Sequence, residues 1–272
     1  MKILIVYPNL PMMITPATSV GIFTSILKQM DCEVEMFETT LYSESENQGM
    51  LFKSKLGGGR SYQLKDLGFS LKPTDVLVPD FIKKVKNYKA NLLLFSTVED
   101  TNLLLESINY LNIPHIVGGV FPINAPEICI NSPYIDVICR YEGELVLSEV
   151  ISLFKQNKNW KKAKGLWYKK DNKIIKNTLQ PLADINNIIP DYSLYDIVRF
   201  NRPIGGKVRQ TIQFETYRGC PYSCTFCNSP MTRQLDKNYL RRKTIEQVEK
   251  ELDYYTEKFN PGNWFIIDDS FL

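Results

Sequence analysis

The chain has 272 residues, enough for one large domain or two small ones, and its hydrophobic content of 44% is ordinary for a globular protein. Its net charge of +3 points neither to nucleic acid nor to a membrane surface as a partner. No apolar run approaches the length of a membrane-spanning helix, and the N-terminal MKILIVYP is too short for the core of a signal peptide. The one basic stretch, residues 155–176, is interpreted as a solvated helix end and hairpin rather than an RNA-facing patch.

Short apolar runs alternate with helical patterns over the first 155 residues. Strands are predicted at residues 2–7, 34–39, 91–96, 115–117 and 135–139. Helices are predicted at residues 22–30, 80–88, 102–111, 125–130 and 144–154. Strands made of Ile, Leu and Val in continuous runs are buried on both faces, which indicates a parallel sheet between two layers of helices. Five strands with their crossovers fit a flavodoxin-like Rossmann domain.

Ligands of such sheets bind beyond the carboxyl ends of the strands. Three groups of residues follow the third, fourth and fifth predicted strands: Ser96-Thr97, Gly118-Gly119 and Glu142-Gly143-Glu144. The glycine pair lets a ligand approach the backbone, although taken alone it also fits a tight strand–helix turn. Elsewhere, the glycine run at residues 57–59 lacks a following Lys-Ser/Thr pair and is interpreted as a flexible loop, not a Walker loop. Cys32, Cys129 and Cys139 are interpreted as buried core cysteines.

The pattern changes in the last third of the chain. A hairpin is predicted at residues 166–176, then an extended connector with Pro181 and Pro190 and a short helix at residues 192–200. A strand with one apolar face follows around residues 212–216. Thr244 and Gln247 form a capping box at the start of a helix whose apolar stripe reaches residue 259. The next strand, residues 264–267, ends in an acidic pair.

Three cysteines lie directly after the strand around residue 214, in the run RGCPYSCTFC. Cys220, Cys224 and Cys227 have the spacing CxxxCxxC, and three thiolates on one loop hold three irons of a 4Fe–4S cubane while the fourth iron stays open. The alternative is a structural zinc site. Zinc usually takes four ligands, however, and the single histidine, His115, lies far upstream. Three neighbouring thiols also cannot all pair as disulfides.

This run resembles the RGCPYxCxFC form of radical S-adenosylmethionine (SAM) enzymes. The resemblance implies a cluster on the three cysteines, with SAM chelated by the open iron and cleaved to methionine and a 5′-deoxyadenosyl radical. It also implies that Phe226 packs near the adenine and that one of Asp268 and Asp269 receives the SAM amino group. The form Asp-Asp-x-Phe at residues 268–271 is frequent in the cobalamin branch, although an acidic pair there also fits a helix N-cap.

The run PHIVGG together with Glu-Gly-Glu resembles the N-terminal cobalamin-binding domain that precedes many radical SAM domains. The resemblance implies that the nucleotide tail of the corrinoid lies against the glycine pair, and that a side chain at either glycine obstructs it. It implies cobalamin contacts from Ser96, Thr97, Gly118, Gly119, Glu142 and Gly143. The loop at residues 8–11 has no histidine, so the cobalamin is expected base-off, without a histidine ligand. Tyr141 departs from the glycine that more commonly precedes Glu-Gly-Glu.

The sequence therefore predicts an α/β chain with a cobalamin-binding-like Rossmann domain at residues 1–158 and a hairpin and linker at residues 159–209. Residues 210–272 are predicted to be the N-terminal portion of a radical SAM partial barrel. A complete (β/α)₈ barrel takes about 250 residues, so the chain is expected to be part of a longer protein or a truncated gene. Because two strands and one helix do not close a core, the apolar face of the last helix is expected to be exposed.

The expected function is that of a cobalamin-dependent radical SAM enzyme that transfers a methyl group to an unactivated carbon. Two alternatives stay open: a radical SAM enzyme of another type, such as a cyclase or methylthiotransferase, and a non-catalytic corrinoid or iron–sulfur binding fragment. Expected partners are a small-molecule or peptide substrate and an electron donor of the flavodoxin or ferredoxin type, with neither membrane nor nucleic acid. Free cysteines and an oxygen-sensitive cluster fit the cytoplasm. The sequence identifies no catalytic side chain.

Overall fold

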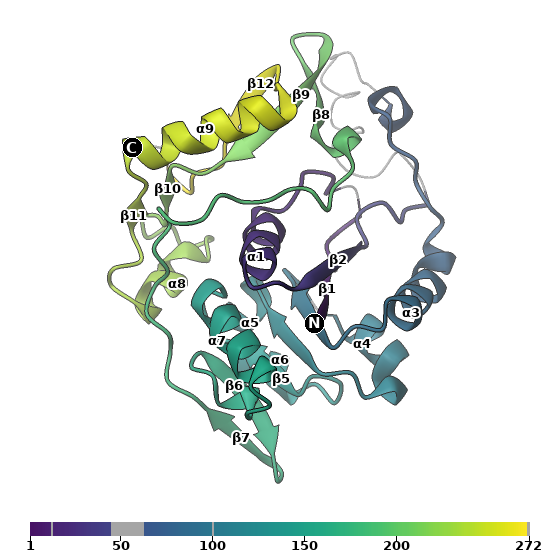
Figure 1. Ribbon diagram of the computed structural model, residues 1–272, viewed down its shortest axis with the longest axis vertical. Helices are drawn as coiled ribbons and strands as arrows, with labels where there is room; N and C mark the ends of the chain where they lie inside the picture. The colour runs from purple at the N-terminus through teal and green to yellow at the C-terminus, as the bar shows by residue number, and fades with distance from the viewer. Residues whose placement is uncertain (12, 45–62, 100, 271–272) are drawn as a thin grey trace.

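The computed structural model describes residues 1–11, 13–44, 63–99 and 101–270. Figure 1 shows two regions joined by a long linker that crosses the molecule. We call residues 2–176 the first region and residues 201–266 the second region. The glycine run at residues 57–59 and Phe271 lie outside the described residues.

The first region is built on one seven-stranded sheet with the order β2-β1-β3-β4-β5-β6-β7. Its strands are β1 (Lys2–Tyr7), β2 (Glu33–Glu38), β3 (Leu92–Ser96), β4 (His115–Gly118), β5 (Val137–Cys139), β6 (Leu166–Lys170) and β7 (Lys173–Lys176). The pairings among β1 to β5 are parallel, and β6 and β7 are added antiparallel. The order 2-1-3-4-5 is that of flavodoxin-like sheets, so the predicted fold class is confirmed.

Helices cover both faces of this sheet. They are α1 (Thr18–Gln29), α3 (Leu77–Tyr88), α4 (Asn102–Ile108), α5 (Val120–Asn124), α6 (Pro126–Asn131) and α7 (Glu144–Lys155). Alternate residues of β1 divide between the two faces: Ile3 and Ile5 pack with α1 and α7, whereas Leu4 and Val6 pack with α3, α4 and α6. All four of these side chains are fully buried. Burial on both faces explains why the strands read as continuous apolar runs.

Two differences from the predicted elements have local causes. The helix predicted at residues 125–130 forms as α6, and a short helix that was not predicted, α5, precedes it; α6 begins with Pro126, which has no N–H to continue the helix before it. The hairpin predicted at residues 166–176 forms, with Asp171 and Asn172 both at positive φ in its turn. It also pairs with β5 and so extends the first sheet.

The second region contains a three-stranded sheet with the order β12-β9-β8. Its elements are β8 (Asn201–Ile204), β9 (Lys207–Phe214), β10 (Tyr217–Arg218), α8 (Ser229–Leu235), β11 (Arg241–Arg242), α9 (Ile245–Phe259) and β12 (Asn263–Ile266). Strands β9 and β12 are parallel and are connected through α8 and α9, while β10 pairs with β11. This is the arrangement with which a β/α barrel would begin; the barrel itself stays a prediction.

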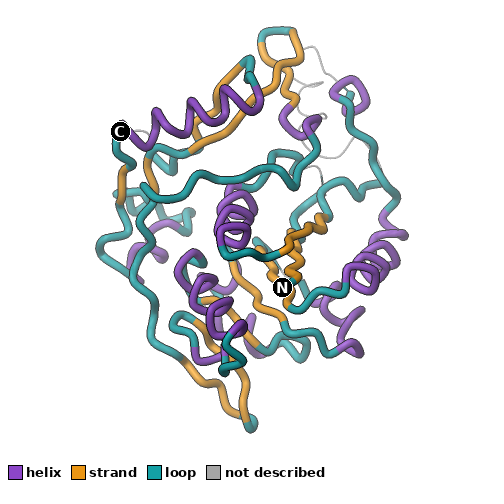
Figure 2. The backbone as a smooth tube through the Cα atoms, in the orientation of Figure 1, coloured by secondary structure: helices purple, strands orange, loops and turns teal. Residues whose placement is uncertain are grey.

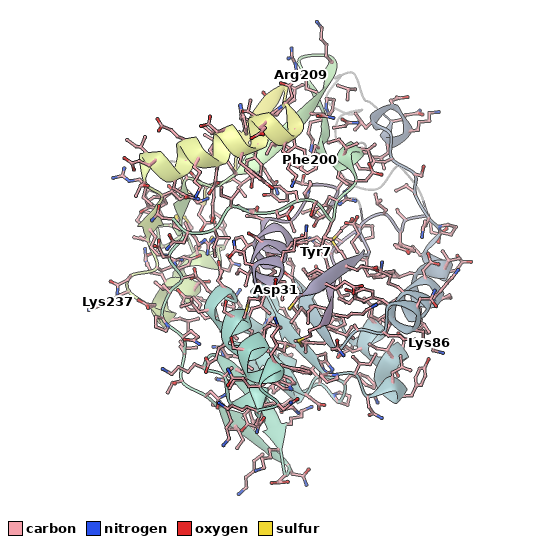
Figure 3. The ribbon with its side chains drawn as sticks, viewed as in Figure 1. Tyr7, Asp31, Lys86, Phe200, Arg209 and Lys237 are labelled. Atoms are coloured by element: carbon pink, nitrogen blue, oxygen red, sulfur yellow. The ribbon has the colours of Figure 1, made fainter. Side chains whose placement is uncertain are left out.

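The expectation that the apolar face of α9 is exposed is wrong. Tyr255 of α9 is fully buried, and its ring lies 5.8 Å from that of the linker residue Tyr192. Phe200, labelled in Figure 3, is fully buried, and its ring centroid lies 5.1 Å from that of Phe259. These rings belong to the same core as α1 and α7. The linker, traced as the long loop in Figure 2, therefore covers the helix with its own aromatic side chains.

The helices among the described residues are all too short or too polar to cross a membrane. Cys32, Cys129 and Cys139 are buried, as predicted.

Candidate functional site

A cavity of about 470 Å³ lies at the carboxyl ends of β3, β4 and β5, between the first and second regions. One wall comes from the sheet and from α1 and α7. The other comes from the second region, through Glu215, Tyr217, Arg218, Tyr239 and Asp269. A crevice beyond the carboxyl ends of parallel strands is where this class of fold binds its ligands.

The part of the cavity between the sheet and its helices is apolar. Its lining comprises Ile22, Leu94, Ile116, Val146 and Leu147. Small polar groups stand at the strand ends above this slot, where the Ser19 and Ser96 hydroxyls are 3.0 Å apart. An apolar slot with a few polar groups at its mouth suits the nucleotide tail of a corrinoid, so the residues present fit the cofactor that the sequence predicts.

The structure brings most of the predicted cobalamin residues to this cavity. The lining includes Ser96, Gly118, Gly119, Glu142, Gly143 and Glu144. Thr97 is absent from the lining among the described residues. It is buried instead, with its N–H donating to the Gly118 carbonyl at 2.9 Å. Thr97 therefore shapes the turn after β4 rather than facing the cavity.

The two glycines after β4 differ in what they tolerate. Gly119 has φ of 101°, and a Cβ there would stand 2.4 Å from the Thr97 carbonyl oxygen. A Cβ on Gly118 would meet the Cβ of Cys139 at an ordinary 3.5 Å. The backbone conformation at position 119 therefore requires glycine. Position 118 accepts a side chain without such strain, so a substitution there tests the role of the cavity.

His115 lies at the amino end of β4, away from the cavity. Its Nε2 accepts a hydrogen bond from the Asp136 N–H at 3.3 Å, and its Nδ1 lies 3.4 Å from the Ile113 carbonyl. Burial lowers the pKa of His115, which favours the neutral ring that these contacts require. The histidine is structural, as the sequence predicts.

The cysteine loop, residues 219–227, follows β10. Cys220 is half-buried, Cys224 and Cys227 are exposed, and all three thiols are free. The Ser229 N–H donates to Sγ of Cys227 at 3.4 Å and lowers the pKa of that thiol. Three free thiols on one loop are a donor set that fits an iron–sulfur cluster.

The loop is braced by Arg233 of α8, whose Nη1 donates to the Cys220 carbonyl at 3.2 Å and whose Nη2 donates to the Ser223 hydroxyl at 2.8 Å. Within the part of the chain that the structure describes, no three His, Cys, Asp or Glu side chains converge on a common point that would hold a metal. The cluster assignment therefore rests on the donor set and its spacing, and stays a prediction.

The structure separates the two aspartates that the sequence left equivalent. Asp268 accepts hydrogen bonds from the Thr216 and Tyr217 N–H groups at 2.6 and 3.0 Å, and so ties β12 to the segment after β9. Asp269 lines the cavity and accepts a hydrogen bond from the Gly219 N–H at 3.2 Å. Burial raises the pKa of Asp269. Asp269 is thus the aspartate in position to meet a ligand.

Phe226, predicted to lie near the adenine of SAM, is 92% exposed on the cysteine loop and contributes nothing to the cavity wall. Its predicted role stays untested, because the structure shows no surface against which an adenine ring would be held there.

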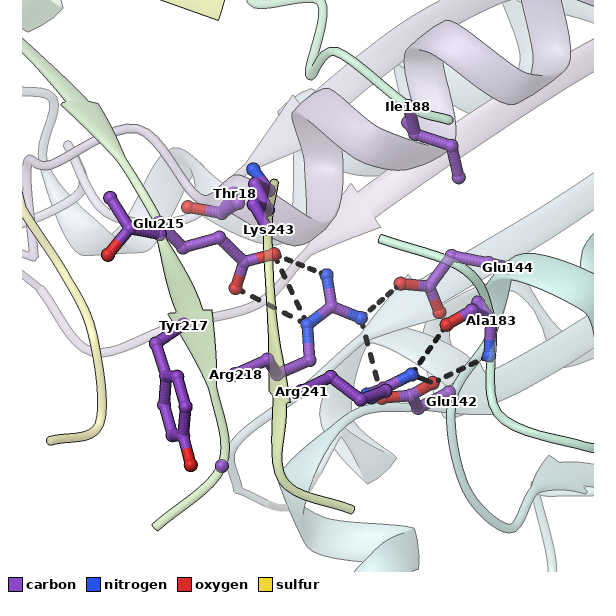
Figure 4. A network of polar contacts seen from close by, with 12 residues as sticks. Thr18, Glu142, Glu144, Ala183, Ile188, Glu215, Tyr217, Arg218, Arg241 and Lys243 are labelled. Carbon is purple, nitrogen blue, oxygen red and sulfur yellow. Dashed lines mark hydrogen bonds and ion pairs between the residues drawn. The ribbon is translucent and has the colours of Figure 1, made fainter. Parts of the chain in front are cut away.

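A buried ion network occupies the cavity wall where the two regions meet, as Figure 4 shows. Arg218 donates to Glu144 at 2.6 Å and to Glu215 at 2.5 Å. Arg241 donates to Glu142 at 2.9 Å and to the Ala183 carbonyl. Burial alone would lower the pKa of Arg218, but the carboxylates of Glu144 and Glu215 raise it well above its usual value.

Sequence reasoning did not find this network. Glu142, which is predicted to contact cobalamin, lines the cavity and accepts hydrogen bonds from Arg241 and from the Ala183 N–H of the linker. Arg218 was visible only as part of the cysteine motif. The sequence offers one signal, which is that Arg218 stands two residues before Cys220. An arginine buried at that place requires carboxylate partners.

The chain is similar to curated proteins over part of its length. No protein-family model matches the chain. The chain is 29% identical over 166 residues to an uncharacterized methyltransferase of Pyrococcus horikoshii, an alignment that covers 59% of this chain and 34% of that protein. It is 31% identical over 118 residues to the anaerobic magnesium-protoporphyrin IX monomethyl ester cyclase of Synechocystis, covering 43% of this chain and 23% of the cyclase. The chain thus spans about a third or less of these relatives.

Two solved structures superpose on nearly the whole chain. One is the cobalamin-dependent SAM radical enzyme OxsB with aqua-cobalamin and SAM bound, with a TM-score of 0.63, 20% identity, and coverage of 99% of this chain and 34% of OxsB. The other is the radical SAM methyltransferase TsrM from Kitasatospora setae, with a TM-score of 0.66, 12% identity, and coverage of 98% and 47%. The fold is that of cobalamin-dependent radical SAM enzymes. At these identities the likeness shows the fold alone.

Proposed function

We propose that this chain is the cofactor-binding part of a cobalamin-dependent radical SAM methyltransferase. The observation that carries the proposal is one cavity with two kinds of wall. The carboxyl ends of β3 to β5 supply a corrinoid slot with Gly118, while the second region supplies Arg218, at the end of β10, and Asp269, just after β12, on the opposite side. A corrinoid and a SAM molecule bound there would face each other across a single space.

Each group of residues has its own role in binding the cofactors. The three loop cysteines would hold the cluster, and Asp269 would receive the amino group of SAM. The apolar slot would bury the nucleotide tail of the corrinoid and exclude water from it. When bound, these cofactors supply a 5′-deoxyadenosyl radical and a transferable methyl group; the protein positions them and keeps the space between them closed.

The remaining parts of the proposal follow from this chemistry. We infer a small-molecule or peptide substrate, an electron donor of the flavodoxin or ferredoxin type, and a reducing cytoplasm as the compartment in which the thiols persist. Base-off cobalamin is proposed because the described lining of the cavity holds no histidine and His115 lies at the opposite end of β4.

A cyclase is the second candidate, favoured by the 31% identity to the magnesium-protoporphyrin IX monomethyl ester cyclase. Product analysis with SAM labelled in its methyl group separates the two. A methyltransferase places the label in the product, whereas a cyclase does not.

The cofactor assignment is tested by loading the chain anaerobically with iron, sulfide and methylcobalamin. We expect about four irons per chain and one corrinoid with a base-off absorption spectrum. Cys220→Ala, Cys224→Ala and Cys227→Ala should each abolish the cluster, with Cys32→Ala as the matched control because that thiol is buried elsewhere. His115→Ala should leave the corrinoid spectrum unchanged.

Three results would contradict the proposal: stoichiometric zinc without iron, a full cluster in the triple cysteine variant, or a corrinoid nitrogen-ligated by His115. Failure to bind any corrinoid would leave only the radical SAM half of the proposal.

A further inference from the structure

Five charged side chains form one connected network: Glu142, Glu144, Glu215 and Arg218, which line the cavity, and Arg241 behind them. Each of these side chains is at most 16% exposed. Three carboxylates against two guanidinium groups leave a formal charge of −1 in a buried place. Such a network is expensive to bury, and removing one partner leaves another charge uncompensated. Its members therefore hold one another in fixed positions.

One end of the network belongs to the corrinoid slot. Glu142 and Glu144 flank Gly143 at the end of β5, and a Cβ on Gly143 would stand only 2.7 Å from the ring of Phe23 in α1. Because position 143 has no side chain, the segment packs closely against α1, whose residues line the same slot. A ligand that fills the slot would therefore contact the segment that carries both carboxylates.

The other end belongs to the cysteine loop. Arg218 is followed by Gly219 and Cys220. The Gly219 N–H donates a hydrogen bond to Asp269. Its φ of 97° is a backbone conformation that residues with a side chain rarely adopt. The guanidinium of Arg218 donates hydrogen bonds to Glu144 of the first region and to Glu215 of the second. Arg218 and Gly219 thus connect Glu144 directly to the first cysteine of the loop.

We propose that Glu144, with Glu142 beside it, is a positioning residue that couples occupancy of the corrinoid slot to placement of the cysteine loop. Corrinoid and cluster then each bind more tightly when the other is present. The proposal rests on the proposed function for the identity of the two occupants. It assigns to the Glu-Gly-Glu segment a role that differs from direct contact with cobalamin.

The physical reason is linkage. If the network is complete only when slot and loop are both in their binding arrangement, each ligand stabilises the state that the other needs, and the effect is reciprocal. Coupling of this kind typically changes affinity by about 5-fold to 150-fold. Glu144→Gln keeps an oxygen that accepts from Arg218 but removes the charge, so it should weaken the coupling while preserving the packing.

The experiment measures the dissociation constant of methylcobalamin for the full chain in two forms, cluster-free and cluster-loaded. In the unaltered chain we expect the cluster-loaded form to bind about fivefold tighter or more. In the Glu144→Gln variant that ratio should fall toward one. Glu149→Gln on the same helix is the matched control, because its carboxylate contacts the Lys164 N–H and Gln180 rather than Arg218. It should retain the full ratio.

A purely structural role for Glu144 would lower both affinities equally and leave the ratio unchanged, which would overturn the proposal. So would a ratio of one in the unaltered chain. If Glu144→Gln does not fold, Glu215→Gln tests the same guanidinium from its other side, with the same outcomes. Absence of any methylcobalamin binding would overturn the coupling together with the corrinoid part of the proposed function; binding without coupling would overturn the coupling alone.

Discussion

The two regions of the molecule bury their strands in different ways. In the first region, the residues of β3 are buried on both faces between layers of helices. In the second region, β12 pairs only with β9 among the described strands, and its Phe265 and Ile266 are 55% and 41% exposed. The first sheet therefore makes its own core. The second region gains its core by packing Tyr255 and the linker rings against α1.

The junction between the regions also has a polar part. Gln213 of β9 donates to the Pro16 carbonyl before α1, and Arg199 of the linker pairs with Glu38 of β2 at 2.9 Å. Both Gln213 and Arg199 are almost fully buried. Buried polar groups are costly unless paired, so these contacts fix one arrangement of the two regions more than they add stability. The position of the second region, and with it that of the cysteine loop, therefore depends on contacts with the first region.

The largest expected effect tests this dependence at α9. Tyr255→Ala removes a fully buried ring and the hydrogen bond from its hydroxyl to the Pro190 carbonyl at 2.9 Å. By analogy with other aromatic truncations, we expect a loss of about 3–5 kcal/mol in the free energy of unfolding. Hydrogen exchange should rise throughout α9 and β12 while β1 to β5 keep their protection.

The matched control is Tyr110→Ala, because Tyr110 is 59% exposed on the first region. It should change the midpoint of urea unfolding little. Equal loss of protection in both regions of the Tyr255→Ala variant would show that they fold as one unit and that the contrast drawn above is wrong.

The second largest expected effect concerns the two glycines after β4 in the first region. Gly118→Leu places a side chain where the backbone tolerates it and should lower methylcobalamin affinity about 100-fold, roughly 2.7 kcal/mol, with little change in stability. Gly119→Ala should instead cost stability, by about 1–3 kcal/mol, because of the positive φ and the contact with Thr97. Titration with methylcobalamin and urea unfolding distinguish the two; identical behaviour of both variants would contradict the assignment of Gly118 to the cavity wall.

Much of the fold was predictable because its determinants are local. Continuous apolar runs gave the buried strands, Thr244 accepts the Gln247 N–H as the capping box predicts, and the glycine pair marks the end of β4. The cysteine motif can be recognised for the same reason, because Cys220, Cys224 and Cys227 lie within eight consecutive residues; that they hold a cluster stays a prediction.

The rest depends on contacts between residues that are distant in sequence. Arg218 and Glu144 are 74 positions apart, and the local sequence around either residue does not indicate that the two form a contact. The choice between Asp268 and Asp269 depends on how β12 registers against β9, which brings Asp268 to the Thr216 N–H. The cover on α9 was missed because its rings come from a linker without regular pattern.

The smallest expected effect concerns a polar contact between the regions and depends on pH. Asp191 of the linker accepts from Lys28 of α1 at 2.8 Å and pairs with Lys258 of α9 at 3.2 Å. Burial by itself would raise the pKa of Asp191, but the hydrogen bonds from Lys28 and Ser193 outweigh it and hold that pKa well below its usual range.

A carboxyl whose pKa is lower in the folded than in the unfolded chain stabilises the fold above the unfolded pKa of about 3.9, and this contribution is lost as the pH falls toward the folded value. Asp191→Asn should therefore cost about 1–3 kcal/mol at pH 7, and the difference from the unaltered chain should shrink as the pH falls below about 4. Urea unfolding of both chains at pH 7, 4 and 3 measures this. Asp171→Asn, in the exposed turn between β6 and β7, is the control and should show no such trend. A cost that stays constant down to pH 3 would mean that packing, and not the charge of Asp191, joins the linker to α1 and α9.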